Sequence, residues 1–287
     1  MRIVGTLIVM AICGYFFFTR LARLVGYLKA GRPEHRTDKV GERFVDFLVY
    51  GLGQKRLFKK AYGGSLHVMI FWGFCVLSIA NLTLILRGFL GEEFNLPLLG
   101  ETEALGMAYT FVKEIFTGLI LVGVGMALNR RLIQKPRFPE HSTEAIIILT
   151  VIMSLMVVEL IWGAAHYAHS GLAGALSDGF RMSHPFTKPL SALFTGPKEQ
   201  LETIMTVSWW INLALVLGFG SYLPYSKHFH IMTSLPNVFA VGVCVPAHAQ
   251  STAPAPVAAP SAEIHRPLRA MPRNDDRLIV MGILAAE

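Results

Sequence analysis

Three histidines, His67, His228 and His230, occur in or beside long apolar stretches of the 287-residue chain. A polar side chain inside a bilayer costs free energy, so each of these positions predicts a structural or functional role. The stretch that contains His67 and the one that precedes His230 would cross a membrane in opposite directions, which brings both imidazoles to a similar depth. Two facing imidazoles at one depth, on helices of a bundle, are the arrangement that axially ligates the iron of a b-type haem.

The residues alone leave alternatives open for these histidines. On one continuous helix His228 and His230 point roughly 200° apart, because a helix has about 3.6 residues per turn, so only one of them can face a given iron. The other interpretation is that the histidines lie at the membrane interface and hydrogen-bond lipid headgroups or backbone.

A second group of ionisable residues lies deeper in the apolar stretches. Lys113, Glu114 and Glu159 lie about 12–15 Å from the ends of their stretches, at a rise of about 1.5 Å per residue. The structural interpretation is a buried Lys–Glu ion pair between two helices. Glu159 and His166 share one helix face and His169 follows one turn later, so the functional interpretation is a proton route, or a second site, leading outward from mid-membrane.

Long membrane helices must position these residues, and the composition predicts them. The chain is 53% hydrophobic and 16% charged, whereas soluble globular domains carry roughly 25% charged residues. This excludes an ordinary soluble enzyme, a disordered chain and a disulfide scaffold. The fold class is therefore all-α integral membrane, a five-helix transmembrane bundle with a disordered C-terminal tail. The five apolar segments are residues 3–19 (extending toward 27), 62–86, 104–128, 143–167 and 203–225, the last continuing to 233.

Lysines and arginines predict the orientation in the lipid bilayer. Loops 20–60 and 129–142 are strongly basic, whereas residues 87–103 carry one arginine against four glutamates. Basic loops stay in the cytoplasm, so the N-terminus lies outside and the C-terminus inside. We expect a multi-pass protein of a bacterial or archaeal cell (inner) membrane. Arg20–Arg23 follow the first segment in place of a cleavage site, so that segment is not interpreted as a signal peptide.

The C-terminal tail differs in character from the rest of the chain. Residues 241–287 are rich in Pro and Ala and are predicted to be disordered. The three cysteines of the chain, Cys13, Cys75 and Cys244, form no CxxC pair, so no iron–sulfur or zinc site is indicated. No basic run is interleaved with aromatic residues, so no nucleic-acid partner is expected.

Two segments resemble a known membrane domain: LPYSKHFHIMTSLPNVF at 223–239 and HVMIFWGF at 67–74. Residues 1–240 are similar to the cytochrome b domain of the respiratory nitrate reductase gamma subunit, as found at the N-terminus of heterodisulfide reductase-related iron–sulfur binding proteins. The resemblance implies haem b held by the second and fifth helices. By match to the motif, His67 and His230 are the axial ligands of the haem iron, and His228 is the reserve choice.

The resemblance also implies the activity. The domain would be the quinol-oxidising membrane subunit of an oxidoreductase complex, passing electrons between the menaquinone or ubiquinone pool and an iron–sulfur partner on the cytoplasmic side. Candidates for contact with the quinone are Tyr225, Lys227 and whichever of His228 and His230 does not ligate the haem. The chain carries no cluster cysteines of its own, so the partner would be a separate heterodisulfide reductase-like subunit. The alternative is that the gene is truncated or frame-shifted after about residue 240.

The chain departs from the pattern at a second, outer haem. The two positions that would ligate it are Leu77 and Asn212, neither of which is a normal haem ligand. His166 and His169 could supply ligands by another route. Other functions also stay open: a small transporter or channel that uses Lys113, Glu114 and Glu159, or a haem-free membrane anchor.

Overall fold

The structure is a computed structural model that describes residues 2–29, 39–55, 57, 61–134, 143–172, 174 and 176–241. These residues form helices and connecting turns, with no strand among them. They group into two compact units. Unit 1 contains the described residues of 1–30 and 56–224, and unit 2 those of 31–55 and 225–241. The predicted disorder of the tail beyond Val241 lies outside the described residues.

Unit 1 contains the five long helices that the sequence predicts. They are α1 (Arg2–Lys29), α3 (Ala61–Leu90), α4 (Ala104–Asn129), α5 (Thr143–Leu172) and α8 (Lys198–Tyr222). All five are long and apolar enough to cross a membrane. The all-α, five-helix fold of a membrane protein is therefore confirmed. A π-helical turn, η3 (Arg130–Gln134), extends α4 into the basic loop.

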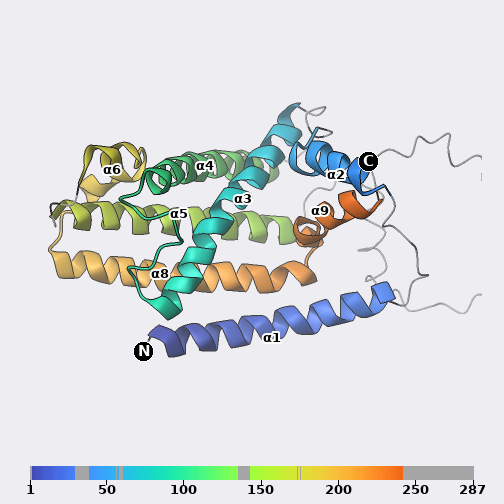
Figure 1. Cartoon of the computed structure of the whole chain (residues 1–287), viewed down its shortest axis with the longest axis horizontal. Coiled ribbons are helices and arrows are strands. Elements are labelled where there is room, and N and C mark those ends of the chain that lie inside the picture. Colours follow the sequence, from blue (N-terminus) through green and yellow to red (C-terminus); the bar gives the residue numbers. More distant parts are fainter. Residues whose placement is uncertain are drawn as a thin grey trace, which may run out of the picture. The chain divides into compact units, whose positions relative to one another are not determined.

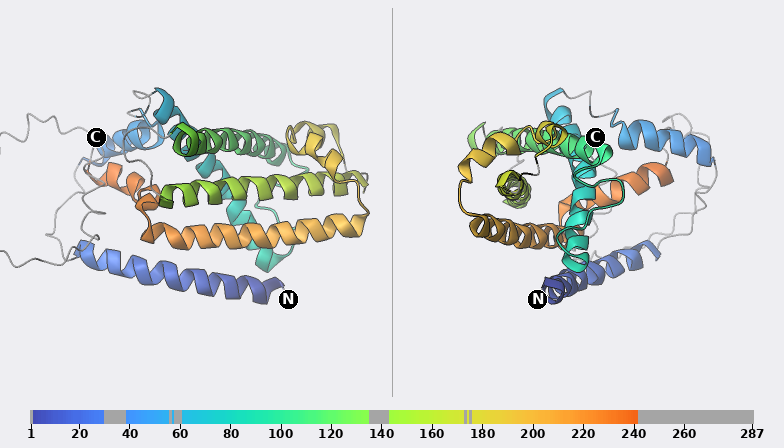
Figure 2. Two further views of the ribbon diagram at one scale, coloured as in Figure 1. Left: turned by 180° about the vertical axis from the view of Figure 1, so that it is seen from behind. Right: turned by 60° about the vertical axis from the view of Figure 1, so that its left-hand side comes forward.

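Three long helices of unit 1 lie side by side, and a fourth crosses them. In Figure 1, α5 lies between α4 and α8, α3 crosses these helices obliquely, and α1 lies along α8. Figure 2 shows the same order from behind. Arg2 at the start of α1 forms an ion pair with Glu92 in the α3–α4 connection. We call this the N-terminal end of unit 1; α4 and α8 begin there, and α3 and α5 end there.

An apolar core joins α3, α4 and α5. Leu77, Ile120, Val124 and Leu149 are among its buried members. The helices approach closely where one side carries no side chain. A Cβ on Gly73 of α3 would collide with the Ile120 side chain of α4, so only glycine fits there without displacing a neighbour.

Short helices cover the N-terminal end of unit 1 between α5 and α8. They are α6 (Asp178–Met182), α7 (Thr187–Leu190) and the 3-10 turn η4 (Ser191–Leu193). Ser177 caps α6, because its hydroxyl accepts the N–H of Phe180 at 3.1 Å.

Unit 2 contains α2 (Val40–Asp46), the π-helical η1 (Phe47–Leu52) and α9 (His230–Val241). Gly51 of η1 faces Leu235 and Val238 of α9. Phe44 of α2 and Leu48 of η1 are 51% and 43% exposed. Such apolar residues among basic ones suit the membrane interface.

The expectation that the fifth apolar helix continues to Thr233 is wrong. Helix α8 ends at Tyr222, and 3-10 turns follow at η5 (Leu223–Tyr225) and η6 (Lys227–Phe229). Between them Ser226 has extended backbone angles, and its hydroxyl accepts the His228 N–H at 3.0 Å, capping the new turn. This local hydrogen bond competes with helix continuation, so His230 begins a separate helix.

Candidate functional site

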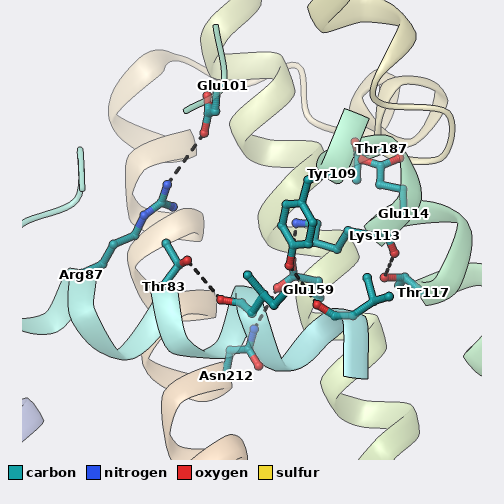
Figure 3. Close-up of polar contacts among 12 residues, drawn as sticks. Thr83, Arg87, Glu101, Tyr109, Lys113, Glu114, Thr117, Glu159, Thr187 and Asn212 are labelled. Atoms are coloured by element: carbon teal, nitrogen blue, oxygen red, sulfur yellow. Dashed lines mark hydrogen bonds and ion pairs between the residues drawn. The ribbon is translucent and has the colours of Figure 1, made fainter. Parts of the chain in front are cut away.

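A polar cavity of about 100 Å³ lies inside unit 1, toward its N-terminal end. Its walls come from α3, α4, α5 and α8, with the α3–α4 connection and the α6–α7 segment at its rim. Figure 3 shows how ionisable side chains from these separate elements converge. The charged residues of the lining are Arg87, Glu101, Lys113, Glu114 and Glu159.

The inner end of the cavity is an ion pair between two spanning helices. Lys113 Nζ of α4 donates to Glu159 Oε1 of α5 at 2.7 Å, and Asn212 Nδ2 of α8 donates to Glu159 Oε2 at 3.0 Å. Both oxygens of the carboxylate are therefore satisfied, as a buried charge requires. Tyr109 on α4 also borders the cavity, and its hydroxyl donates to the Val76 carbonyl at 3.0 Å.

The outer end holds a second charged cluster. Glu101 lies 3.9 Å from Arg87 Nη2 and 3.5 Å from His166 Nε2. The His166 ring stacks on Trp162, with ring centroids 4.9 Å apart and planes 7° apart. Arg87 lies over the same indole at 5.5 Å from its centroid, a cation–π geometry. The Glu101 side chain is 33% exposed, so this cluster reaches the surface.

The Glu114 carboxylate binds Phe186 and Thr187, at the start of α7. Its Oε2 accepts the backbone N–H of Phe186 at 2.7 Å and of Thr187 at 3.1 Å, and its Oε1 accepts the Thr187 hydroxyl. Helix α7 also approaches α5 closely, since a Cβ on Gly163 would lie 2.7 Å from Thr187 Cγ2. Glu114 thus fastens the α6–α7 segment to the spanning helices.

His184 stands at the rim, in the connection between α6 and α7. Its Nδ1 lies 2.8 Å from the Phe180 carbonyl, which can only accept, so Nδ1 carries the proton. The ring packs on Phe180 at 4.3 Å between centroids. Burial lowers the pKa of the His184 imidazole, against the opposing effects of the Phe180 hydrogen bond and of Glu114.

Four of the five residues that the sequence offered for a proton route or second site line this one cavity: Lys113, Glu114, Glu159 and His166. His169 is not in the lining; its Nε2 lies 3.3 Å from Glu202 of α8. The buried ion pair between the third and fourth spanning helices is present, as Lys113 with Glu159.

Sequence reasoning missed Arg87 and Glu101, which complete the outer cluster. Arg87 sits in the last turn of an apolar helix, and a charged residue at that place is the one signal that could have found it. Nothing in the sequence spacing connects Glu101 with His166, because they are brought together by the packing of a loop on α5.

The candidate haem ligands fall in both units. His67 is an exposed residue of α3 in unit 1, whereas His228 and His230 belong to unit 2. The rings of His228 and His230 are neighbours, with centroids 5.7 Å apart. On one continuous helix the two side chains would instead point roughly 200° apart. They can be neighbours because a 3-10 turn ends at Phe229 and α9 begins at His230. The pairing of His67 with His230 stays a prediction.

Gly63 lies one helical turn before His67 on α3, and among the described residues no atom lies within 4 Å of the place a Cβ on Gly63 would take. Helix surface without a side chain beside an imidazole would leave room for a haem face.

The residues at the outer haem position do not fit a haem. Leu77 is part of the apolar core at 5% exposure, and the Asn212 amide is engaged with Glu159. An aliphatic side chain and a committed amide offer no ligand to iron.

Two curated proteins are similar to the chain. The "Probable iron-sulfur-binding oxidoreductase FadF" of Bacillus subtilis is 32% identical over 234 residues, covering 81% of this chain and 32% of that protein. The "EtfAB:quinone oxidoreductase" of Syntrophomonas wolfei is 26% identical over 229 residues, covering 77% of this chain and 31% of that protein. The chain thus spans about a third of the length of each. No protein-family profile and no solved structure matches. The chain therefore combines five helices long and apolar enough to cross a membrane with sequence similarity to part of two oxidoreductases.

Proposed function

We propose that the chain is a haem b membrane subunit that carries electrons between the quinone pool and an iron–sulfur oxidoreductase on the cytoplasmic side. The observation that carries the proposal is the match of 81% of the chain to a protein named as an iron–sulfur-binding oxidoreductase. The second relative, whose name states a quinone as reactant, supports the quinone half of the proposal.

His67 and His230 would hold the haem through their imidazole nitrogens, with His228 as the reserve ligand. The haem, when bound, supplies a one-electron centre inside the membrane. The protein's own contribution is to fix the ligand orientation. The helix surface without a side chain at Gly63, one turn before His67, supports this placement.

The electrons would pass from the haem to an iron–sulfur acceptor. Its three cysteines form no CxxC pair, so we assign the iron–sulfur chemistry of the relatives' names to a heterodisulfide reductase-like module. The basic loops at 20–60 and 129–142 would offer an acidic partner a complementary surface. Their other use is to set topology and bind anionic lipid.

A small transporter or channel is the second candidate. The observation in its favour is that Lys113, Glu114 and Glu159 all line one cavity. Against it, Lys113 and Glu159 bind each other at 2.7 Å, and Glu114 is bound to the α7 segment.

The test is reconstitution of the purified chain with a quinol. The quinol should produce a reduced haem spectrum, while sustained turnover should need the added iron–sulfur protein. His67→Ala and His230→Ala should each abolish the spectrum, because one imidazole rarely retains a low-spin b haem. His169→Ala is the matched control and should keep it. An unchanged haem spectrum in His67→Ala would refute the ligand assignment. A loss of the haem spectrum in His169→Ala would indicate that a haem ligand lies at the N-terminal end of unit 1.

A further inference from the structure

We propose that the polar cavity of unit 1 holds water and conducts protons between the N-terminal end of the unit and the Lys113–Glu159 pair, with His166 as the relay. The inference deepens the proposed function and rests on it only for the use of the protons, because quinone chemistry couples protons to electrons. The physical claim about the cavity stands on side-chain geometry alone.

A buried hydrogen-bond donor without an acceptor indicates that the cavity contains water. The Trp209 side chain is buried at 3% exposure and lines the cavity, and its Nε1–H has no acceptor within the described part of the chain. Buried polar groups are nearly always hydrogen-bonded, so water is the partner that fits. A cavity of about 100 Å³ has room for a few water molecules, at roughly 30 Å³ for each.

His166 has the position of a relay between the surface and this water. Glu101 is partly exposed, and its Oε2 lies 3.5 Å from His166 Nε2. A protonated Glu101 carboxyl can pass its proton to Nε2, which leaves a carboxylate and an imidazolium. The imidazolium then releases the Nδ1 proton to cavity water, so that no net charge is left on the ring.

The formal charges of the cavity lining are unbalanced by one negative charge. Two basic residues, Arg87 and Lys113, face three acidic ones, Glu101, Glu114 and Glu159, which leaves one unbalanced negative charge. The groups that act on His166 are Glu101 from the α3–α4 connection, Arg87 from α3, Lys113 from α4 and His184 from the α6–α7 segment. One added proton neutralises the cluster.

The inner end of the path is the Lys113–Glu159 pair. Glu159 precedes His166 by two helical turns, or about 10 Å along α5 at a rise of about 1.5 Å per residue. That gap is too long for direct transfer and needs bridging water, which the cavity accommodates. Glu114 and His169 are left out, because the first is bound to α7 and the second is not in the lining.

The Trp162–His166 stack supplies a readout that needs no haem. An imidazolium quenches the fluorescence of an indole in ring contact, so the emission of Trp162 reports the charge of His166. We would subtract the emission of Trp162→Phe from that of the full-length chain in detergent and follow the difference after a stopped-flow pH jump. The difference signal should respond to pH, and His166→Gln should abolish the response.

Glu101→Gln tests the entry point. It should slow the response at least tenfold, because it removes the carboxylate between surface and ring. The matched control is Glu202→Gln at the same end of the unit, which should leave the rate unchanged. A Glu101→Gln rate equal to that of the unsubstituted chain, or a pH-independent Trp162 signal, overturns the relay. A signal that follows Na⁺ concentration at fixed pH would assign the cavity to a metal cation instead, which also overturns the proposal.

Deuterium exchange at the Trp209 indole tests for water. In ²H₂O, ultraviolet resonance Raman difference spectra against Trp209→Phe should show exchange of this buried N–H within minutes. Protection for hours would mean a dry cavity and would end the proposal. Both readouts are independent of haem, so a chain that binds no haem can still pass them, and a haem protein can still fail them.

Discussion

Replacing Glu114 should release the α6–α7 segment from the spanning helices. The carboxylate is 3% exposed and accepts from the N–H groups of Phe186 and Thr187 and from the Thr187 hydroxyl. Hydrogen bonds to a charged group contribute about 1.5–3 kcal/mol each. Because the three bonds share one acceptor, their energies are not additive, and Glu114→Ala should cost the segment about 3–6 kcal/mol.

Hydrogen exchange measured by mass spectrometry would detect this loss. A factor of ten corresponds to about 1.4 kcal/mol, so the amides of residues 183–193 should exchange about 10²–10⁴-fold faster. Glu202→Ala is the matched control, since its side chain is 54% exposed and bonds His169 at the surface; it should change exchange there less than about threefold. Unchanged protection of residues 183–193 in Glu114→Ala would refute the anchoring role.

Three further predictions concern stability. Lys113→Met should destabilise the folded chain by about 3–5 kcal/mol, because it leaves the buried Glu159 carboxylate without its ion-pair partner. The double variant Lys113→Met with Glu159→Gln should recover most of this loss in thermal unfolding followed by size-exclusion chromatography. An equal loss of stability in both variants would contradict the prediction. Gly73→Ala should cost about 1–3 kcal/mol in the same assay by overpacking against Ile120, and added Ile120→Ala should relieve part of it; additive losses would count against the close contact. The lowered pKa of His184 means that the unfolded chain binds more protons below about 6.5, so the stability contributed by neutral His184 is fully present above that pH and is lost as pH falls toward the folded pKa. The protection factors of residues 178–186, which are corrected for the intrinsic pH dependence of amide exchange, should fall from pH 7 to 5, and His184→Gln should remove most of that fall.

The spanning helices were predictable because the bilayer imposes their length and composition. About 20 apolar residues are needed to cross it, and the predicted segments 62–86, 104–128 and 143–167 begin and end within five residues of α3, α4 and α5. The end of α8 was not predictable from hydropathy. Residues 226–233 contain no glycine or proline that would stop a helix. The Ser226 hydroxyl nevertheless caps a new turn, and a local hydrogen bond of this kind leaves no periodic pattern.

The cavity was predictable only in part. Lys113, Glu159 and His166 stand out because charge inside an apolar stretch is costly. Their partners do not, because Glu101 lies in a loop and looks like an ordinary acidic surface residue. The role of Glu114 also could not be predicted, since its partners are backbone N–H groups, which any sequence offers.

The measurement that tests the central claim most directly is the absorption spectrum of the purified, dithionite-reduced chain. The account predicts a haem b alpha band and one haem per chain in a pyridine haemochrome assay, because the outer pair, Leu77 and Asn212, offers no ligand. A chain that is folded and helical but shows no alpha band would contradict the account and favour a transporter or a haem-free anchor.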